Sequence, residues 1–153
     1  MAENIENTVT SVTTFKIAGE YFAFETMKIR HILEYMEPTS VPLSKDYILG
    51  VINNHGNMVP VVNTSDMFGI KDESEHPEAS IVIVATDDTN DSLLGFLVDE
   101  VDDVFDYTQD DWSKDVVMQI NDTVQATLSG TIKKDEKFVY TVNIAELAKV
   151  IEN

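Results

Sequence analysis

The feature that most constrains the fold of this chain is an internal repeat of a short β-hairpin pattern. The segment GVINNHGNMVPVVNTSDM (50–67) aligns without a gap with GTIKKDEKFVYTVNIAEL (130–147), at an offset of 80 residues. In the first copy, Asn and Gly lie between β-branched runs, which is typical of a hairpin. A second match, at an offset of 72 residues, joins AFETMKIRHILEY (23–35) to GFLVDEVDDVFDY (95–107). Two matches in the same order predict two similar lobes, each built mainly of short strands.

The repeat also predicts how the chain is organised. We expect a flexible N-terminus over residues 1–12 and a single domain over 13–153, with a first lobe over about 13–70, a second over about 80–143 and a closing helix over 144–151. Lobes of roughly 60–70 residues are only marginally stable alone, so the two are expected to share a core. Short strands close most easily into small barrels, because closure removes exposed edges. The predicted fold class is therefore all-β with short helices, and a groove between the lobes is the natural place for a partner.

Charge is the one extreme property of the composition. The chain has 28 acidic and 10 basic residues, a formal net charge of −18. Of the acidic residues, 11 fall between Asp87 and Asp115, a stretch that holds one lysine. A polyanion repels nucleic acid and anionic lipid, so DNA, RNA and membrane-surface binding are excluded. Two explanations of the acidity stay open: solubility, as in a salty cytoplasm, and electrostatic steering toward a basic partner.

The sequence offers little of the chemistry that enzymes use. It has no cysteine, which removes disulfides, thiolate catalysis and Cys-based zinc sites. His31, His55 and His76 form no HExxH motif and no i,i+4 pair, so neither a metal site nor another cofactor is expected. The motifs GxSxG, GxGxxG and the P-loop are absent. The chain is therefore not expected to be an enzyme.

The sequence also lacks signals that would send the chain to a membrane. The first residues have no basic region and no apolar core of a signal peptide. No apolar run approaches the roughly 20 residues that span a bilayer. A cytoplasmic location is expected.

As a whole, the chain resembles the CheW family, the adaptors of bacterial and archaeal chemotaxis. The resemblance runs from about Phe15 to the end and is carried by EYFAF (20–24), KIRHI (28–32), YILGVINNHGNMVPVVN (47–63), MFG (67–69), LLGFLVDEVDDV (93–104) and LSGTIKKDEKFVYTVNIAEL (128–147). The family's hallmark is a GVxNxRGxxxPVxDLR hairpin followed by a short helix. Its second lobe carries a GxxVDxVxDV segment, matched here from Gly95 to Val104. The resemblance implies two five-stranded SH3-like barrels packed around a shared core.

The resemblance further implies a non-enzymatic function. CheW-like proteins couple the cytoplasmic tip of chemoreceptors to the histidine kinase CheA, whose regulatory domain has the same fold and can alternate with them in rings. The expected partners are therefore a chemoreceptor tip and the regulatory domain of a CheA-type kinase. The alternative is a CheW-like protein that binds a different kinase or competes with the main adaptor. An adaptor–receiver fusion is not expected, because no receiver domain follows the closing helix.

Two binding surfaces follow from positions that match the family. The predicted receptor groove consists of Ile29, His31, Gly50, Asn53, His55, Gly56, Val98 and Asp99. The predicted kinase-facing edge consists of Thr39, Ser40, Val41, Pro42 and Leu43. An apolar edge of this kind can pair with a barrel of the same fold. A purely structural role stays open for Ile29 in the core, and for Gly50 and Gly56 through backbone geometry.

The chain departs from the family pattern at the hairpin. The family's Arg before the hairpin glycine is His55 here, its Glu in the VxEI segment is His31, and its DLR reads Asn63-Thr64-Ser65. His cannot reproduce the planar, permanently charged contact of Arg. We infer that a paired charge interaction became a His–His neighbourhood in the receptor groove, so that receptor affinity depends on pH near neutrality. The alternative is that His55 is a neutral turn residue.

Overall fold

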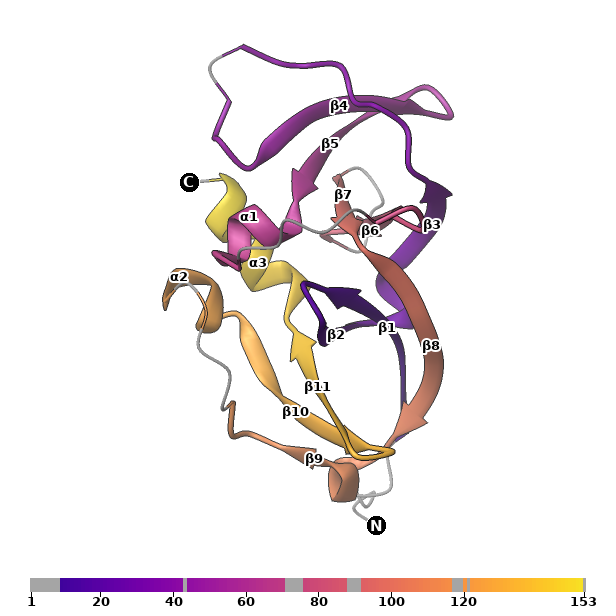
Figure 1. The fold of residues 1–153 in the computed structure, drawn as a ribbon, viewed down its shortest axis with the longest axis vertical. Coiled ribbons are helices and arrows are strands. Elements are labelled where there is room, and N and C mark those ends of the chain that lie inside the picture. Colours follow the sequence, from indigo (N-terminus) through magenta and orange to yellow (C-terminus); the bar gives the residue numbers. More distant parts are fainter. Residues whose placement is uncertain are drawn as a thin grey trace.

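The structure, a computed structural model, describes residues 9–42, 44–70, 76–87, 92–116, 120 and 122–152. Short strands dominate these residues (Figure 1). The elements are β1 (Thr10–Ile17), β2 (Glu20–Glu25), the 3-10 turn η2 (Thr26–Lys28), β3 (Ile29–Glu34), β4 (Ile48–Asn54), β5 (Asn57–Asn63), α1 (Thr64–Phe68), β6 (Ser80–Ala85), β7 (Leu93–Val98), β8 (Glu100–Tyr107), the 3-10 turn η3 (Gln109–Asp111), β9 (Trp112–Ser113), α2 (Asp122–Gln125), β10 (Leu128–Lys134), β11 (Lys137–Val142) and α3 (Ile144–Glu152).

The strands form two sheets, and each sheet takes strands from both halves of the chain. One sheet has the order β8-β1-β2-β11-β10-β9, and the other has the order β3-β6-β7-β5-β4 (Figure 1). Parallel pairing joins β2 to β11 and β5 to β7. The sheets therefore do not follow the expected division at 13–70 and 80–143. The strands β2 and β5 of the first half pair with β11 and β7 of the second half.

The internal repeat is confirmed by the strand orders. Each strand of one sheet has an equivalent at the same place in the other sheet. The order β3-β6-β7-β5-β4 corresponds, strand by strand, to β8-β1-β2-β11-β10. The irregularities of pairing coincide as well. A register shift at 48–50 recurs at 128–130, and a shift at 29–31 recurs at 101–103. The difference from the predicted pair of five-stranded barrels is β9, a strand of 2 residues that adds a sixth strand to one sheet.

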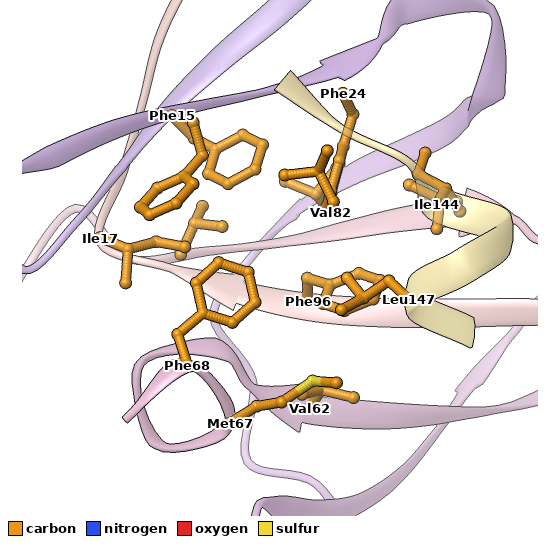
Figure 2. Packing of buried hydrophobic residues seen from close by; sticks show 14 of the residues in the cluster. Phe15, Ile17, Phe24, Val62, Met67, Phe68, Val82, Phe96, Ile144 and Leu147 are labelled. Carbon is orange, nitrogen blue, oxygen red and sulfur yellow. The ribbon is translucent and has the colours of Figure 1, made fainter. Parts of the chain in front are cut away.

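Both sheets and the helices α1, α2 and α3 contribute to one aromatic-rich core, part of which is shown in Figure 2. The ring centroids of Phe15 and Phe24 are 4.7 Å apart, and those of Phe24 and Phe96 are 5.3 Å apart. Phe96 comes from β7, so this contact joins the two sheets. Phe68 of α1 and Leu147 of α3 complete the cluster, and both are fully buried. The predicted shared core is confirmed.

The N-terminal boundary differs from the expectation. The flexible terminus was predicted over residues 1–12, of which 1–8 lie outside the described residues. Strand β1 begins at Thr10, and Val12 is 1% exposed. β1 lies between β2 and β8, and this pairing on both sides accounts for the earlier start.

Candidate functional site

His55 lies at the tip of the β4–β5 hairpin. The strands pair as far as Asn54 opposite Asn57, so the loop holds only His55 and Gly56. Their φ angles are 53° and 85°, the combination that a type I′ turn requires. The Gly56 N–H donates a 2.9 Å hydrogen bond to Asn53 Oδ1. Backbone geometry thus accounts for Asn53 and Gly56, and it leaves the exposed imidazole of His55 at the tip.

His31 lies on strand β3 and faces His55. The two ring centroids are 5.2 Å apart, and the ring planes are tilted by 40°. Both residues are exposed. His31 follows the register shift at the start of β3, where Ile29 is opposite Val84 and His31 is opposite Ile83. The predicted adjacency of the two histidines is confirmed, although a long connector and β4 separate them in the chain.

Gly50 is buried where the connector crosses β4. Its φ is +147°, and a Cβ at this position would collide with the carbonyl of Thr39. Thr39 and Val51 exchange backbone hydrogen bonds of 2.9 and 2.8 Å, which hold the connector against β4. A glycine permits this close approach of two backbones. Of the two roles left open for Gly50, the structure supports backbone geometry.

The other predicted receptor-groove residues lie at or near the core. Ile29 is half-buried against the shared cluster, and Val98 is 0% exposed. Val98 therefore supplies packing and presents no surface to a partner. Asp99 Oδ2 accepts a 2.7 Å hydrogen bond from the Ala18 N–H and lies 3.4 Å from His76 Nε2. Asp99 thus ties the crossing from β7 to β8 to the β1–β2 turn.

The predicted kinase-facing edge is exposed. Its first four residues lie on the surface: Thr39, Ser40, Val41 and Pro42. The fifth, Leu43, lies outside the described residues. Beneath the connector is a cavity of about 440 Å³. Its apolar lining includes Val41, Ile48, Val51, Met58, Pro60 and Ile151. Met58 is 62% exposed, so the apolar surface continues out of the cavity toward the hairpin.

Sequence reasoning missed the residue that fixes α3 beside this cavity. Lys45 Nζ donates hydrogen bonds of 3.0 and 2.7 Å to the carbonyls of Val150 and Ile151. A cation at the C-terminus of a helix satisfies free carbonyls and interacts favourably with the helix dipole. No local signal identifies this contact, because Lys45 and Val150 are 105 residues apart in the sequence.

The residues that replace the family's DLR have local structural roles. Asn63 caps α1, since its Oδ1 accepts hydrogen bonds from the Asp66 N–H at 3.4 Å and from the Ser65 hydroxyl at 2.9 Å. Thr64 is 0% exposed, and within the described part of the chain its hydroxyl has no hydrogen-bond partner. These residues shape the start of α1.

The described residues offer little for acid–base chemistry. Burial raises the pKa of Tyr107, which keeps the phenol protonated near neutral pH. A hydrogen bond with Tyr21 raises the pKa of Lys16, which keeps the amine charged. No group of three or more His, Cys, Asp or Glu side chains that could hold a metal ion occurs among the residues that the structure describes. Among the same residues, no helix is long and apolar enough to cross a membrane.

Known proteins similar to this chain agree in family and fold. The CheW-like domain family matches residues 11–152. The chain is 29% identical over 140 residues to the chemotaxis protein CheW of Thermotoga maritima, covering 92% of this chain and 88% of the relative. It is 27% identical over 135 residues to the chemotaxis protein CheW of Helicobacter pylori, covering 88% and 79%.

A solved structure supports the same architecture. The crystal structure of the scaffolding protein TtCheW from Thermoanaerobacter tengcongensis matches with a TM-score of 0.76 at 20% identity, covering 88% of this chain and 89% of that one. This likeness confirms the predicted all-β fold with two SH3-like lobes. The chain belongs to the CheW-like domain family, and the curated relatives named above are chemotaxis proteins.

Proposed function

We propose that the protein is a non-enzymatic, cytoplasmic adaptor that couples chemoreceptors to a CheA-type histidine kinase. The observation that carries this proposal is the family match over residues 11–152, nearly the whole chain. The named relatives are chemotaxis proteins CheW, and the similar solved structure is a scaffolding protein. The described surfaces support an adaptor, because they combine an exposed apolar edge with an exposed hairpin tip.

The connector edge is the proposed docking surface for the kinase. Val41 is 39% exposed and lines the apolar cavity with Val51 and Met58. An apolar pocket with a polar rim is the arrangement that holds the anchoring side chains of a partner. The proposed occupant is an apolar side chain of the kinase's regulatory domain.

The β4–β5 hairpin tip is the proposed docking surface for the receptor. Of the eight residues predicted for this groove, four are exposed, His31, Asn53, His55 and Gly56, and the rings of His31 and His55 lie against each other. Four of the predicted residues support this surface through turn geometry, packing and hydrogen bonds: Gly50, Gly56, Val98 and Asp99. We therefore narrow the proposed receptor contacts to the three exposed side chains, those of His31, Asn53 and His55, with Ile29 partly accessible beside them.

A calorimetric titration with the regulatory domain of a CheA-type kinase from the same genome tests the proposal. We expect saturable one-to-one binding at low and at high salt. Val41→Asp should weaken it at least tenfold, because the substitution places a charge against an apolar pocket. His31→Ala is the matched control and should bind the kinase like the wild type. Absence of binding at both salt concentrations by a folded protein would contradict the adaptor function.

The receptor surface is tested separately with a receptor cytoplasmic fragment at pH 6 and pH 8, in a buffer that contains a chelator. Histidine changes charge in this range, so affinity should differ between the two pH values in the wild type. In His55→Ala the difference should shrink. Identical pH profiles of the two proteins would contradict a role of His55 in the pH dependence of receptor binding.

A second candidate function rests on the hairpin departures. The chain has His55 where the family has Arg and His31 where it has Glu, so the fold can serve a different kinase or compete with a main adaptor. A competitor of the main adaptor would still bind the CheA-type domain, whereas the titration would fail for a protein that serves a different kinase. Binding to another kinase from the same genome would then identify the partner.

A further inference from the structure

We propose that His31 and His55 together bind a divalent transition-metal ion, with water in the remaining coordination positions. The sequence predicted no metal site, because no two histidines are spaced for one helix or one local motif. The fold nevertheless places these two imidazoles against each other at the surface. The proposal concerns the protein alone and goes beyond its function as an adaptor.

The separation of the rings fits a shared ion. Zinc–nitrogen bonds are about 2.0–2.1 Å long, and two imidazoles at a tetrahedral angle on one ion have ring centroids about 5 Å apart. The centroids of His31 and His55 are 5.2 Å apart, and their planes are tilted by 40°. The ring separation is therefore that of two imidazoles on a shared ion, and rotation of the two side chains would turn one nitrogen of each ring toward it.

Strand pairing and a closed turn hold the backbones of both histidines. His31 lies on β3, which pairs with β6 through five residues up to Glu34. His55 lies in a two-residue turn that the Gly56 N–H closes onto Asn53 Oδ1 at 2.9 Å. Ligands that are held in place lose little conformational freedom on binding, so both nitrogens contribute to affinity. An ion at this position would link β3 to the hairpin tip.

The ligand set indicates the kind of ion. Imidazole nitrogens suit Zn²⁺, Ni²⁺ and Cu²⁺, whereas Mg²⁺ and Ca²⁺ prefer oxygen ligands. Among the described residues no third His, Cys, Asp or Glu completes a group of three. The site is therefore a two-ligand chelate that is open to solvent, unlike a closed structural zinc site.

Calorimetric titration of the full chain with NiCl₂ tests the proposal, and titration with MgCl₂ serves as the reference for binding to the acidic surface. We expect one Ni²⁺ site and a loss of affinity of about 100-fold in His31→Gln, since a second tethered ligand contributes through effective concentration. His55→Asn should show the same loss. Asn tolerates a positive φ, so this variant keeps the turn. The control His76→Gln removes the third histidine and should bind Ni²⁺ within about twofold of the wild type.

Two results would overturn the proposal. Ni²⁺ affinity that changes less than threefold in either His31→Gln or His55→Asn would show that the rings do not chelate one ion. A loss in His76→Gln equal to the loss in the other variants would place the ion elsewhere. Because neither receptor nor kinase is present, these results are independent of the adaptor function.

Discussion

The two hairpins that the repeat relates share a backbone geometry. The β4–β5 turn holds His55 and Gly56 at φ angles of 53° and 85°, and the β10–β11 turn holds Asp135 and Glu136 at 50° and 67°. Both are two-residue turns with positive φ at each position, although the second has no glycine. This turn type matches the right-handed twist of the paired strands. Strand twist thus preserves the turn even where the residue type is unfavourable.

The surfaces beside the two turns differ in chemistry. At the first hairpin, His31 meets His55 with a centroid separation of 5.2 Å. At the second, the equivalent positions carry two aspartates, and Lys134 Nζ lies 4.2 Å from the ring centroid of Phe105. The two lobes therefore share the turn geometry that strand twist requires, whereas their exposed residues beside the turns differ in type.

The largest expected effect concerns the shared core. Phe24 and Phe96 occupy equivalent positions of the repeat, are both 0% exposed and make an edge-to-face contact at 5.3 Å. Phe24→Ala and Phe96→Ala should each lower the free energy of unfolding by about 3–5 kcal/mol. The double variant should differ from the sum of the two, because the rings touch. Urea unfolding measures all three, and strict additivity would argue for two independent cores.

The next effect concerns equivalent glycines in the two lobes. A Cβ at Gly50 would meet the Thr39 carbonyl, and a Cβ at Gly130 would meet the Ser113 carbonyl. Gly50→Ala and Gly130→Ala should each cost about 2–3 kcal/mol of unfolding free energy. Gly19→Ala is the control, because Gly19 has a φ of +83° but no atom within 4 Å of the added Cβ, and it should cost about 1 kcal/mol. Equal costs for Gly50→Ala and Gly19→Ala would contradict the close approach.

The second position of the turn is glycine in one hairpin and glutamate in the other. Glu136 is held at a φ of 67°, where an L residue costs about 1–2 kcal/mol. Glu136→Gly should therefore stabilise the protein by about 0.5–1 kcal/mol, after the greater freedom of glycine in the unfolded chain is subtracted. Gly56→Ala should destabilise it by about 1 kcal/mol. Thermal unfolding reports both, and shifts of the same sign would show that turn strain does not control these hairpins.

The smallest expected effect compares the starts of α1 and α3. Thr64 is buried without a hydrogen-bond partner among the described residues, and its equivalent in the repeat is the buried Ile144. Thr64→Val removes the unpaired hydroxyl at nearly constant shape and should stabilise the protein by about 1 kcal/mol.

Thr141→Val is the matched control for this prediction. The Thr141 hydroxyl is hydrogen-bonded to Ser129 Oγ at 2.7 Å and to the Gly130 carbonyl at 3.2 Å. Its removal should destabilise the protein by about 1 kcal/mol in the same denaturant titration. Destabilisation by Thr64→Val would show that its hydroxyl is satisfied.

Local signals predicted the hairpins and the closing helix well. The second hairpin and its closing helix were expected from residues 130–147, and Asn143 Oδ1 accepts a 3.1 Å hydrogen bond from the Glu146 N–H as a helix cap. The repeat predicted two similar units. It did not predict which strands pair, because similarity along the chain marks equivalent positions and carries no information on neighbours in a sheet.

The candidate site was predicted less completely than the fold. His31, Asn53 and His55 lie exposed at or beside the hairpin tip as expected, whereas Val98 is buried and Asp99 holds the β1–β2 turn. Burial depends on which face of a strand meets the core. A sequence motif alone does not distinguish a residue that supports a surface from one that forms it.

Alternation, turn residues and motif spacing act over a few residues, so the sequence alone predicted the all-β class, the hairpin around His55 and the resemblance to the family. Only the tertiary structure decided that each sheet takes strands from both halves and that His31 meets His55. That contact depends on the register of β3. A slip of one residue would turn His31 to the other face of the sheet, away from the hairpin tip.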